Sequence, residues 1–160
     1  MSSSTPAAAI TSLDHLVLTV ASIEDSVSWY SQHLGMKHES FVSAATPDVK
    51  RHSLLFGQQK INLHQSGKVV AFFTVKVAAD HGLQSQEFEP KARNVQPGSA
   101  DLCFLTSYSV SEVRTKLIAG GVNMVDLGGE KSDQGIVMRT GAKGKLKSVY
   151  CRDPDGNLIE

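Results

Sequence analysis

LDHLVLTV, residues 13–20, is the first stretch with a clear pattern, because one of its two alternating faces is fully apolar. This pattern predicts a β-strand that buries one face. The apolar face carries Leu16, Leu18 and Val20, and the opposite face carries His15, Val17 and Thr19. We therefore expect one side of this strand to pack in a core and the other side to face solvent or a cavity.

A helical pattern follows directly. Ser22 and Asp25 have the spacing of a capping box, and Gly35 stands where a helix C-cap glycine is expected. Between them the apolar residues recur at helical spacing. This stripe consists of Ile23, Val27, Tyr30 and Leu34. Three further strands are predicted at about 37–43, 51–56 and 60–65.

The same order of patterns recurs in the second half of the chain. A strand is predicted at 100–106, a helix begins at the capping box of Ser109 and Glu112, and two glycines at 120–121 end it. A shift of 86 residues superimposes His15 on Asp101. Strands are then predicted at about 122–127, 134–139, 147–152 and from 157, one of them as a short hairpin arm.

The repeat predicts an α+β fold built from two βαβββ modules that form a curved half-barrel sheet. We place a disordered tail at 1–11 and one domain at 12–160. Within that domain the first module covers about 12–68, the second about 98–160, and a linker or insert occupies 69–97. Each module has one helix to cover one sheet face, so the other face, here called the helix-free face, must be covered otherwise or line a cavity.

Composition narrows the possible partners. The chain has 160 residues and a formal net charge of zero, so no overall charge attracts nucleic acid or an anionic membrane. It has no apolar run long enough to cross a bilayer. Its two cysteines, Cys103 and Cys151, are too few for a disulfide framework. We expect both to be reduced in a cytoplasmic protein that acts on a small molecule.

Strand phase places four polar residues on the helix-free faces. His15 belongs to the first strand of module one and His64 to its last strand, while Asp101 and Glu160 occupy the first and last strands of module two. Two imidazoles and two carboxylates are a reasonable set of ligands for Zn, Ni, Fe or Mn. The alternative is a polar pocket in which Asp101 and His64 simply form a hydrogen bond.

Two segments resemble a known family. LDHLVLTVASIEDSVSWYSQHLGM and VYCRDPDGNLIE are similar to the opening and closing segments of the glyoxalase, bleomycin-resistance and extradiol-dioxygenase superfamily, also called vicinal oxygen chelate proteins. KINLHQSGK, EFEPKA, PGSADLCFLT and RTGAKG resemble its subgroup around glyoxalase domain-containing protein 5. The resemblance covers most of 12–160.

The resemblance implies a divalent metal ion on the concave side of the half-barrel, held by His15, His64, Asp101 and Glu160. In the family the position of Asp101 usually carries His or Gln, and glyoxalase I usually has Glu where His64 stands. Glu160 corresponds to the glutamate that moves a proton in glyoxalase I, so we assign it the catalytic role. The alternative is that Glu160 only binds the metal.

The loop RTGAKGKLKS carries several cations, of which Arg139 and Lys143 are candidates for binding an anionic substrate. A solvated basic hairpin explains the same pattern equally well. If the strand phase continues past this loop, Tyr150 and Arg152 also lie on the helix-free face.

Three functions remain open. The first is a metal-dependent lyase or isomerase of the glyoxalase type, acting on a small α-oxo or vicinal-oxygen substrate. The second is an extradiol-type Fe(II) dioxygenase, with His15, His64 and Glu160 as its facial triad. The third is a non-catalytic protein that binds a small ligand, as bleomycin-resistance proteins do. Family members often dimerise, so a homodimer is a further expectation.

Two parts of the chain depart from the resemblance. Residues 69–86 interrupt it with an apolar, β-prone stretch, which is either an extra strand at a dimer interface or a retained intron, with the second slightly favoured. The subgroup also continues a few residues beyond the glutamate at position 160, which suggests a truncated chain.

Overall fold

The computed structural model describes residues 12–43, 46–67, 92–126, 135–142 and 144–160. The first half contains β1 (Leu16–Val20), α1 (Ile23–Leu34), β2 (Lys37–Ser43), β3 (Thr46–Phe56) and β4 (Gln59–Gln65). The second half contains β5 (Asp101–Leu102), α2 (Val110–Ala119), β6 (Met124–Val125), β7 (Val137–Gly141), β8 (Gly144–Ser148), β9 (Tyr150–Arg152) and β10 (Leu158–Ile159). The predicted tail at 1–11 and the stretch at 69–86 lie outside the described residues.

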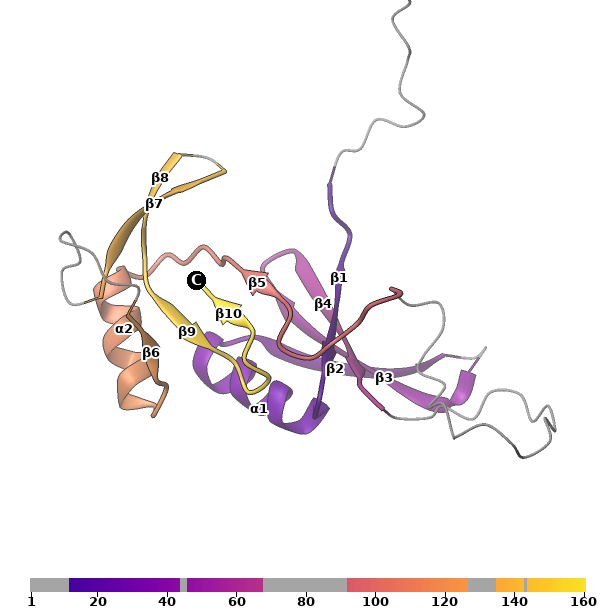
Figure 1. Cartoon of the computed structure of the whole chain (residues 1–160). Coiled ribbons are helices and arrows are strands. Elements are labelled where there is room, and N and C mark those ends of the chain that lie inside the picture. Colours follow the sequence, from indigo (N-terminus) through magenta and orange to yellow (C-terminus); the bar gives the residue numbers. More distant parts are fainter. Residues whose placement is uncertain (1–11, 44–45, 68–91, 127–134, 143) are drawn as a thin grey trace, which may run out of the picture.

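Two four-stranded sheets carry the repeat (Figure 1). Their strand orders are β1-β4-β3-β2 and β5-β10-β9-β6, so in each sheet the first strand of the half pairs with its last strand. Both of these pairings are parallel. The predicted α+β architecture of curved open sheets is confirmed.

The signals that predicted α1 act at both of its ends. The backbone N–H of Asp25 donates to the Ser22 side chain at 3.2 Å, which satisfies one of the free amides of the first turn. Gly35 ends the helix with φ 66°, a left-handed conformation that glycine adopts at little cost. The Ser109 hydroxyl caps α2 in the same way, by accepting from the N–H of Glu112.

The second module is less regular than the alternation predicts. β5 covers only two residues where a strand over 100–106 was expected, and Leu105, 72% exposed, has no core to pack against. β7 and β8 pair only with each other, as a hairpin outside the four-stranded sheet. In Figure 1 this hairpin projects beyond α2 and β9. It corresponds to the hairpin arm expected among the later strands.

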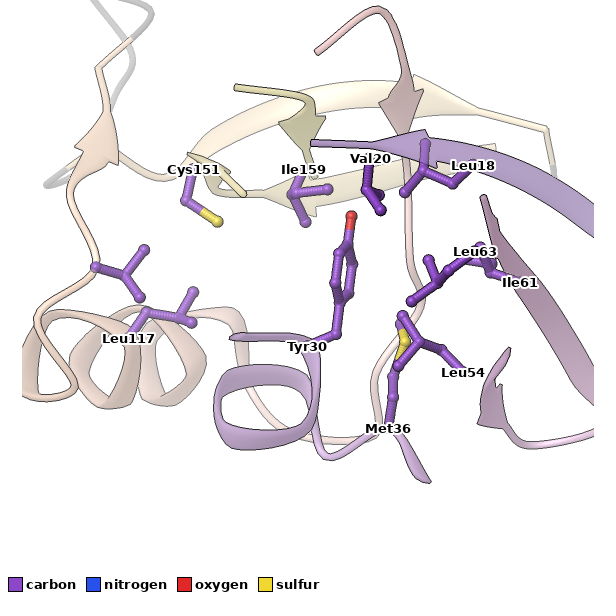
Figure 2. Close-up of a cluster of buried hydrophobic side chains, with 11 residues drawn as sticks. Leu18, Val20, Tyr30, Met36, Leu54, Ile61, Leu63, Leu117, Cys151 and Ile159 are labelled. Atoms are coloured by element: carbon purple, nitrogen blue, oxygen red, sulfur yellow. The ribbon is translucent and has the colours of Figure 1, made fainter. Parts of the chain in front are cut away.

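A single hydrophobic core joins the two modules. Tyr30 of α1 is fully buried, and its ring lies between the first sheet and Ile159 and Cys151 of the second (Figure 2). Leu117 of α2 belongs to the same cluster. The core therefore lies on the helix side of both sheets, and α1 contributes to both halves.

The turn DPDG between β9 and β10 fastens this core with hydrogen bonds. The Tyr30 hydroxyl donates to the Asp153 carboxylate at 2.9 Å, and the Asn157 amide nitrogen donates to the same oxygen at 2.8 Å. The N–H of Ala21, just before α1, donates to Asp155 at 2.9 Å. Because these hydrogen bonds join residues of the first module to the turn of the second, the motif connects the two modules.

Among the described helices, none is long and apolar enough to span a membrane. Both cysteines are free: Cys151 is buried in the core and Cys103 is exposed.

Candidate functional site

The helix-free face of the first sheet has the predicted phase. Leu18, Val20, Ile61 and Leu63 are buried on the helix side. On the other side the parallel register pairs Val17 with Asn62 and Thr19 with His64. His15 lies just before β1 on the same side by alternation, and its Nδ1 contacts the carboxylate of Asp14 at 2.6 Å.

The helix-free face of the second sheet carries two acids, Asp101 and Glu160. Asp101 pairs with Leu158, and the backbone of Glu160 bonds on either side of Cys103, through Leu102 and Phe104. The Ser148 hydroxyl donates to the Glu160 carboxylate at 2.5 Å. Ser148 thus orients Glu160. Sequence analysis did not identify Ser148, and the signal available for it was its spacing of two residues from Tyr150.

Arg139, on β7 of the hairpin, contacts Tyr150 of β9. Its Nε donates to the hydroxyl of Tyr150 at 3.1 Å, and its guanidinium lies 5.6 Å from the centre of that ring. By the register of β9 and β10, Tyr150 lies opposite Glu160. Arg139 thus contacts Tyr150, and its role as a substrate-binding cation stays a prediction. Lys143, the second predicted cation, lies outside the described residues.

The pairing registers change the correspondence between the modules. Leu16 pairs with Ile61 in the first sheet, and its repeat partner Leu102 pairs with Ile159 in the second. The residue equivalent to Glu160 is therefore Asn62, not His64. The alternation placed both Asn62 and His64 on the helix-free face, so it could not choose between them.

The four predicted metal ligands do not come together around one ion in this structure. His64 pairs with Thr19, four residues beyond His15 along the chain. Within the described part of the chain, no three His, Cys, Asp or Glu residues are grouped so that they could hold a metal ion. The quartet as predicted does not fit a shared metal site here.

Burial and nearby charge shift the pKa values of His64 and Cys103. The pKa of His64 is lowered by burial and by the charges of Arg51 and His15, so its imidazole is neutral at pH 7. The pKa of the Cys103 thiol is raised by burial, by the charge of Glu160 and by its hydrogen bond to that acid. Cys103 therefore stays a protonated thiol and acts as a hydrogen-bond donor.

A cavity of about 210 Å³ opens beside Glu160. Its apolar wall is formed by α2 and the helix side of the second sheet, while Cys103, Ser148 and Glu160 lie among its lining residues. The remaining lining residues include Leu34, Val110, Val113, Leu117, Cys151 and Ile159. An apolar cavity that carries a few polar groups at one side is typical of a site for a small organic molecule.

The paired βαβββ sheets and the polar helix-free faces define a class of protein that comparison with known families identifies. Residues 12–160 match the Glyoxalase/Bleomycin resistance protein/Dioxygenase superfamily, and the chain belongs to it. The resemblance found in the opening and closing segments is thereby confirmed at the level of the superfamily.

Individual relatives cover nearly the whole chain. Virulence protein STM3117 of Salmonella typhimurium is 43% identical over 92% of this chain and 81% of its own length. Glyoxalase domain-containing protein RDO1 of Mycosarcoma maydis is 40% identical over 94% of this chain and 67% of its own. An integron cassette protein of V. Cholerae has 44% identity and a TM-score of 0.71, covering 95% of this chain and 94% of that one.

More distant structures share the fold alone. They include lactoylglutathione lyase from Agrobacterium tumefaciens, with 18% identity and a TM-score of 0.55. The fosfomycin resistance protein FosX from Listeria monocytogenes, solved with Mn(II), has 17% identity and a TM-score of 0.52. An antibiotic-binding protein from Streptomyces, TnmS3, has 16% identity and a TM-score of 0.54. The superfamily therefore includes enzymes, resistance proteins and ligand-binding proteins.

Proposed function

We propose that this protein is a glyoxalase-like lyase or isomerase that acts on a small α-oxo compound, with Glu160 as its proton-transferring base. The observation that supports the proposal is the placement of Glu160. Its carboxylate is oriented by Ser148, lies opposite Tyr150 and lines the cavity of about 210 Å³. A carboxylate that borders an apolar hollow can take a proton from a substrate bound there.

The proposed chemistry uses the chain's own groups. Glu160 removes the proton from a carbon next to a carbonyl, and the electron pair moves onto the carbonyl oxygen to form an enolate. Arg139, aligned by its contacts with Tyr150, holds that oxygen or a carboxylate of the substrate. Where the deprotonated carbon carries a hydroxyl group, the proton of that hydroxyl passes to the former carbonyl oxygen and a new carbonyl forms at this carbon. Glu160 returns its proton to the former carbonyl carbon, which gives an isomer without any oxidant. Lys143 is proposed as a second cation for the anionic part of the substrate.

The divalent metal predicted with the quartet takes no part in these steps. His15 and Asp101 are proposed to contact substrate from the two helix-free faces, and His64 to line the first of them. One distant protein of this fold was solved with Mn(II), and elemental analysis tests whether this protein also binds a divalent metal ion. We also propose membership of the subgroup around glyoxalase domain-containing protein 5, which KINLHQSGK and EFEPKA support.

A second candidate is ligand binding without turnover. It is favoured by the register, because Asn62, a neutral amide, occupies the position equivalent to Glu160, and its oxygen accepts from the Ser53 hydroxyl at 2.9 Å. A site with one carboxylate and one neutral amide in these positions is better suited to bind a polar ligand than a divalent metal ion.

The test is proton exchange. The protein is incubated with a panel of small α-oxo and α-hydroxy ketones in D₂O, and loss of the α-proton signal is followed by NMR. We expect exchange with wild type and at least a hundredfold loss for Glu160→Gln, the typical range for removing a general base. Glu112→Gln, at an exposed ion pair with Lys116, is the matched control and should keep full activity.

The two candidates give different results in this assay. Binding of a panel compound without exchange, retained in Glu160→Gln, would favour the ligand-binding protein. Equal exchange rates in wild type and Glu160→Gln would remove Glu160 from the mechanism.

A further inference from the structure

Two histidines face each other across the outer strands of the first sheet. β2 and β3 are antiparallel, with His38 opposite Leu54 and His52 opposite Ser40. The two side chains are therefore diagonal neighbours on one face. Nε2 of His38 lies 3.0 Å from Nδ1 of His52. The patterning did not assign a role to either residue.

The two rings meet edge to edge. Their planes differ by only 4° and their centres are 5.2 Å apart. Since the facing nitrogens are 3.0 Å apart, they lie between the centres, as in an N–H···N hydrogen bond, and the rings do not stack face to face. One nitrogen donates and the other accepts, depending on which tautomer each ring adopts.

This separation matches that of two nitrogens on one metal ion. Imidazole nitrogens bind late first-row divalent ions at about 2.0–2.1 Å, so two cis ligands lie about 3 Å apart, and tetrahedral ligands slightly further. We propose that His38 and His52 form a two-histidine site for a divalent cation such as Ni(II), Cu(II) or Zn(II), with water in the remaining positions.

Binding requires only a local change. The proton between the rings moves, by way of solvent, to the far nitrogen of the ring that donated it. Both facing nitrogens then present a lone pair, and each ring turns by roughly 45° so that both lone pairs point at one ion. No proton is lost from the pair in this rearrangement.

The His38–His52 pair is separate from the candidate active site. His52 lies on the helix side of the first sheet, where Leu54 and Leu63 are buried. Asn62 and Ser53 lie on the helix-free face. His38 is exposed and His52 partly so, so an ion can reach them from solvent. Among the described residues, two histidines supply the site, and no group of three His, Cys, Asp or Glu residues there could hold a metal ion.

The test is Ni(II) binding to the full chain by isothermal titration calorimetry near pH 7.5. We expect His38→Ala and His52→Ala each to weaken binding at least tenfold. His33→Ala, on α1, is the matched control and should leave the affinity unchanged. Thermal unfolding of each variant checks that it is folded, and His38→Gln serves as a second variant of similar size.

Wild-type affinity in both His38→Ala and His38→Gln would overturn the site. So would a loss of binding in His33→Ala equal to that in His38→Ala, because the loss would then not be specific to the pair. The inference does not depend on the proposed enzymatic function. It does affect how that function is tested, since metal found in purified wild type has to be compared with metal in His38→Ala before it is assigned to the helix-free faces.

Discussion

Asn62 and His64 illustrate what the alternation of residues can decide. Both residues face away from the helix, and a period of two cannot distinguish positions that differ by two. The choice depends on which residue of β1 each one pairs with, and pairing between strands this far apart in sequence is a property of the folded chain. The polar faces were therefore predictable from the sequence, but their register was not.

His64 should make stability depend on pH. Its folded pKa is lowered below the ordinary value of 6.5 by burial and by the charges of Arg51 and His15, so in that range the unfolded chain binds more protons. The stabilisation is complete above the unfolded pKa and is lost as pH falls below it. We expect melting temperature to fall less between about pH 7.5 and about pH 5.5 in His64→Gln than in wild type.

The control for this measurement is His33→Gln, which keeps His64 and should fall with pH as wild type does. If His64→Gln and wild type lose the same stability over that interval, burial of His64 is not what makes the fold sensitive to acid.

At the scale of elements, the helix signals were reliable because they are local. Ser22 and Ser109 cap the two helices through contacts three residues away, and Gly35 supplies the left-handed turn that ends α1. The second module was harder to predict. The strand predicted at 134–139 becomes part of the self-paired β7–β8 hairpin, while the one predicted at 147–152 is divided between β8 of that hairpin and β9 of the four-stranded sheet. Alternation does not specify the partner of a strand.

Tyr30 should be the strongest single link between α1 and the β9–β10 turn. Tyr30→Phe keeps the buried ring but removes the donor to Asp153, which leaves a buried carboxylate with one hydrogen bond fewer. We expect a loss of about 1–2 kcal/mol in the free energy of unfolding, measured with urea. Tyr108→Phe, at a 60% exposed side chain, should change stability by less than about 0.5 kcal/mol.

Gly98 should tolerate no side chain. It has φ +77°, and a Cβ there would lie 2.4 Å from the carbonyl oxygen of Asp155, in the same turn that holds Tyr30. Gly98→Ala therefore combines backbone strain with a clash, and we expect it to cost about 2–4 kcal/mol in urea unfolding.

Gly121→Ala is the matched control, because Gly121 has φ +83° but open space around its Cβ position. It should cost about 1 kcal/mol from backbone strain alone. Equal losses at positions 98 and 121 would show that the close approach to Asp155 contributes nothing.

At the scale of the whole molecule, the first helix-free face exposes apolar surface. Val17 is 42% exposed and Phe41 47% exposed, and the register places both on this side of the sheet. Exposed apolar side chains that share a face favour self-association. We expect Val17→Asp to shift the protein towards monomer in analytical ultracentrifugation. Ile118→Asp, at a 46% exposed position on α2, should leave the association state unchanged.

The parallel closure of each module also bears on how the chain tolerates changes in length. β1 pairs with β4 and β5 pairs with β10, so each half completes its own sheet before the other is needed. None of these pairings spans the stretch between Gln65 and Asp101. For a flexible connection, doubling its length costs only about 0.6 kcal/mol of closure entropy. Evolution, or an engineer, can therefore lengthen or shorten the connector containing residues 69–86 without shifting any strand by one residue.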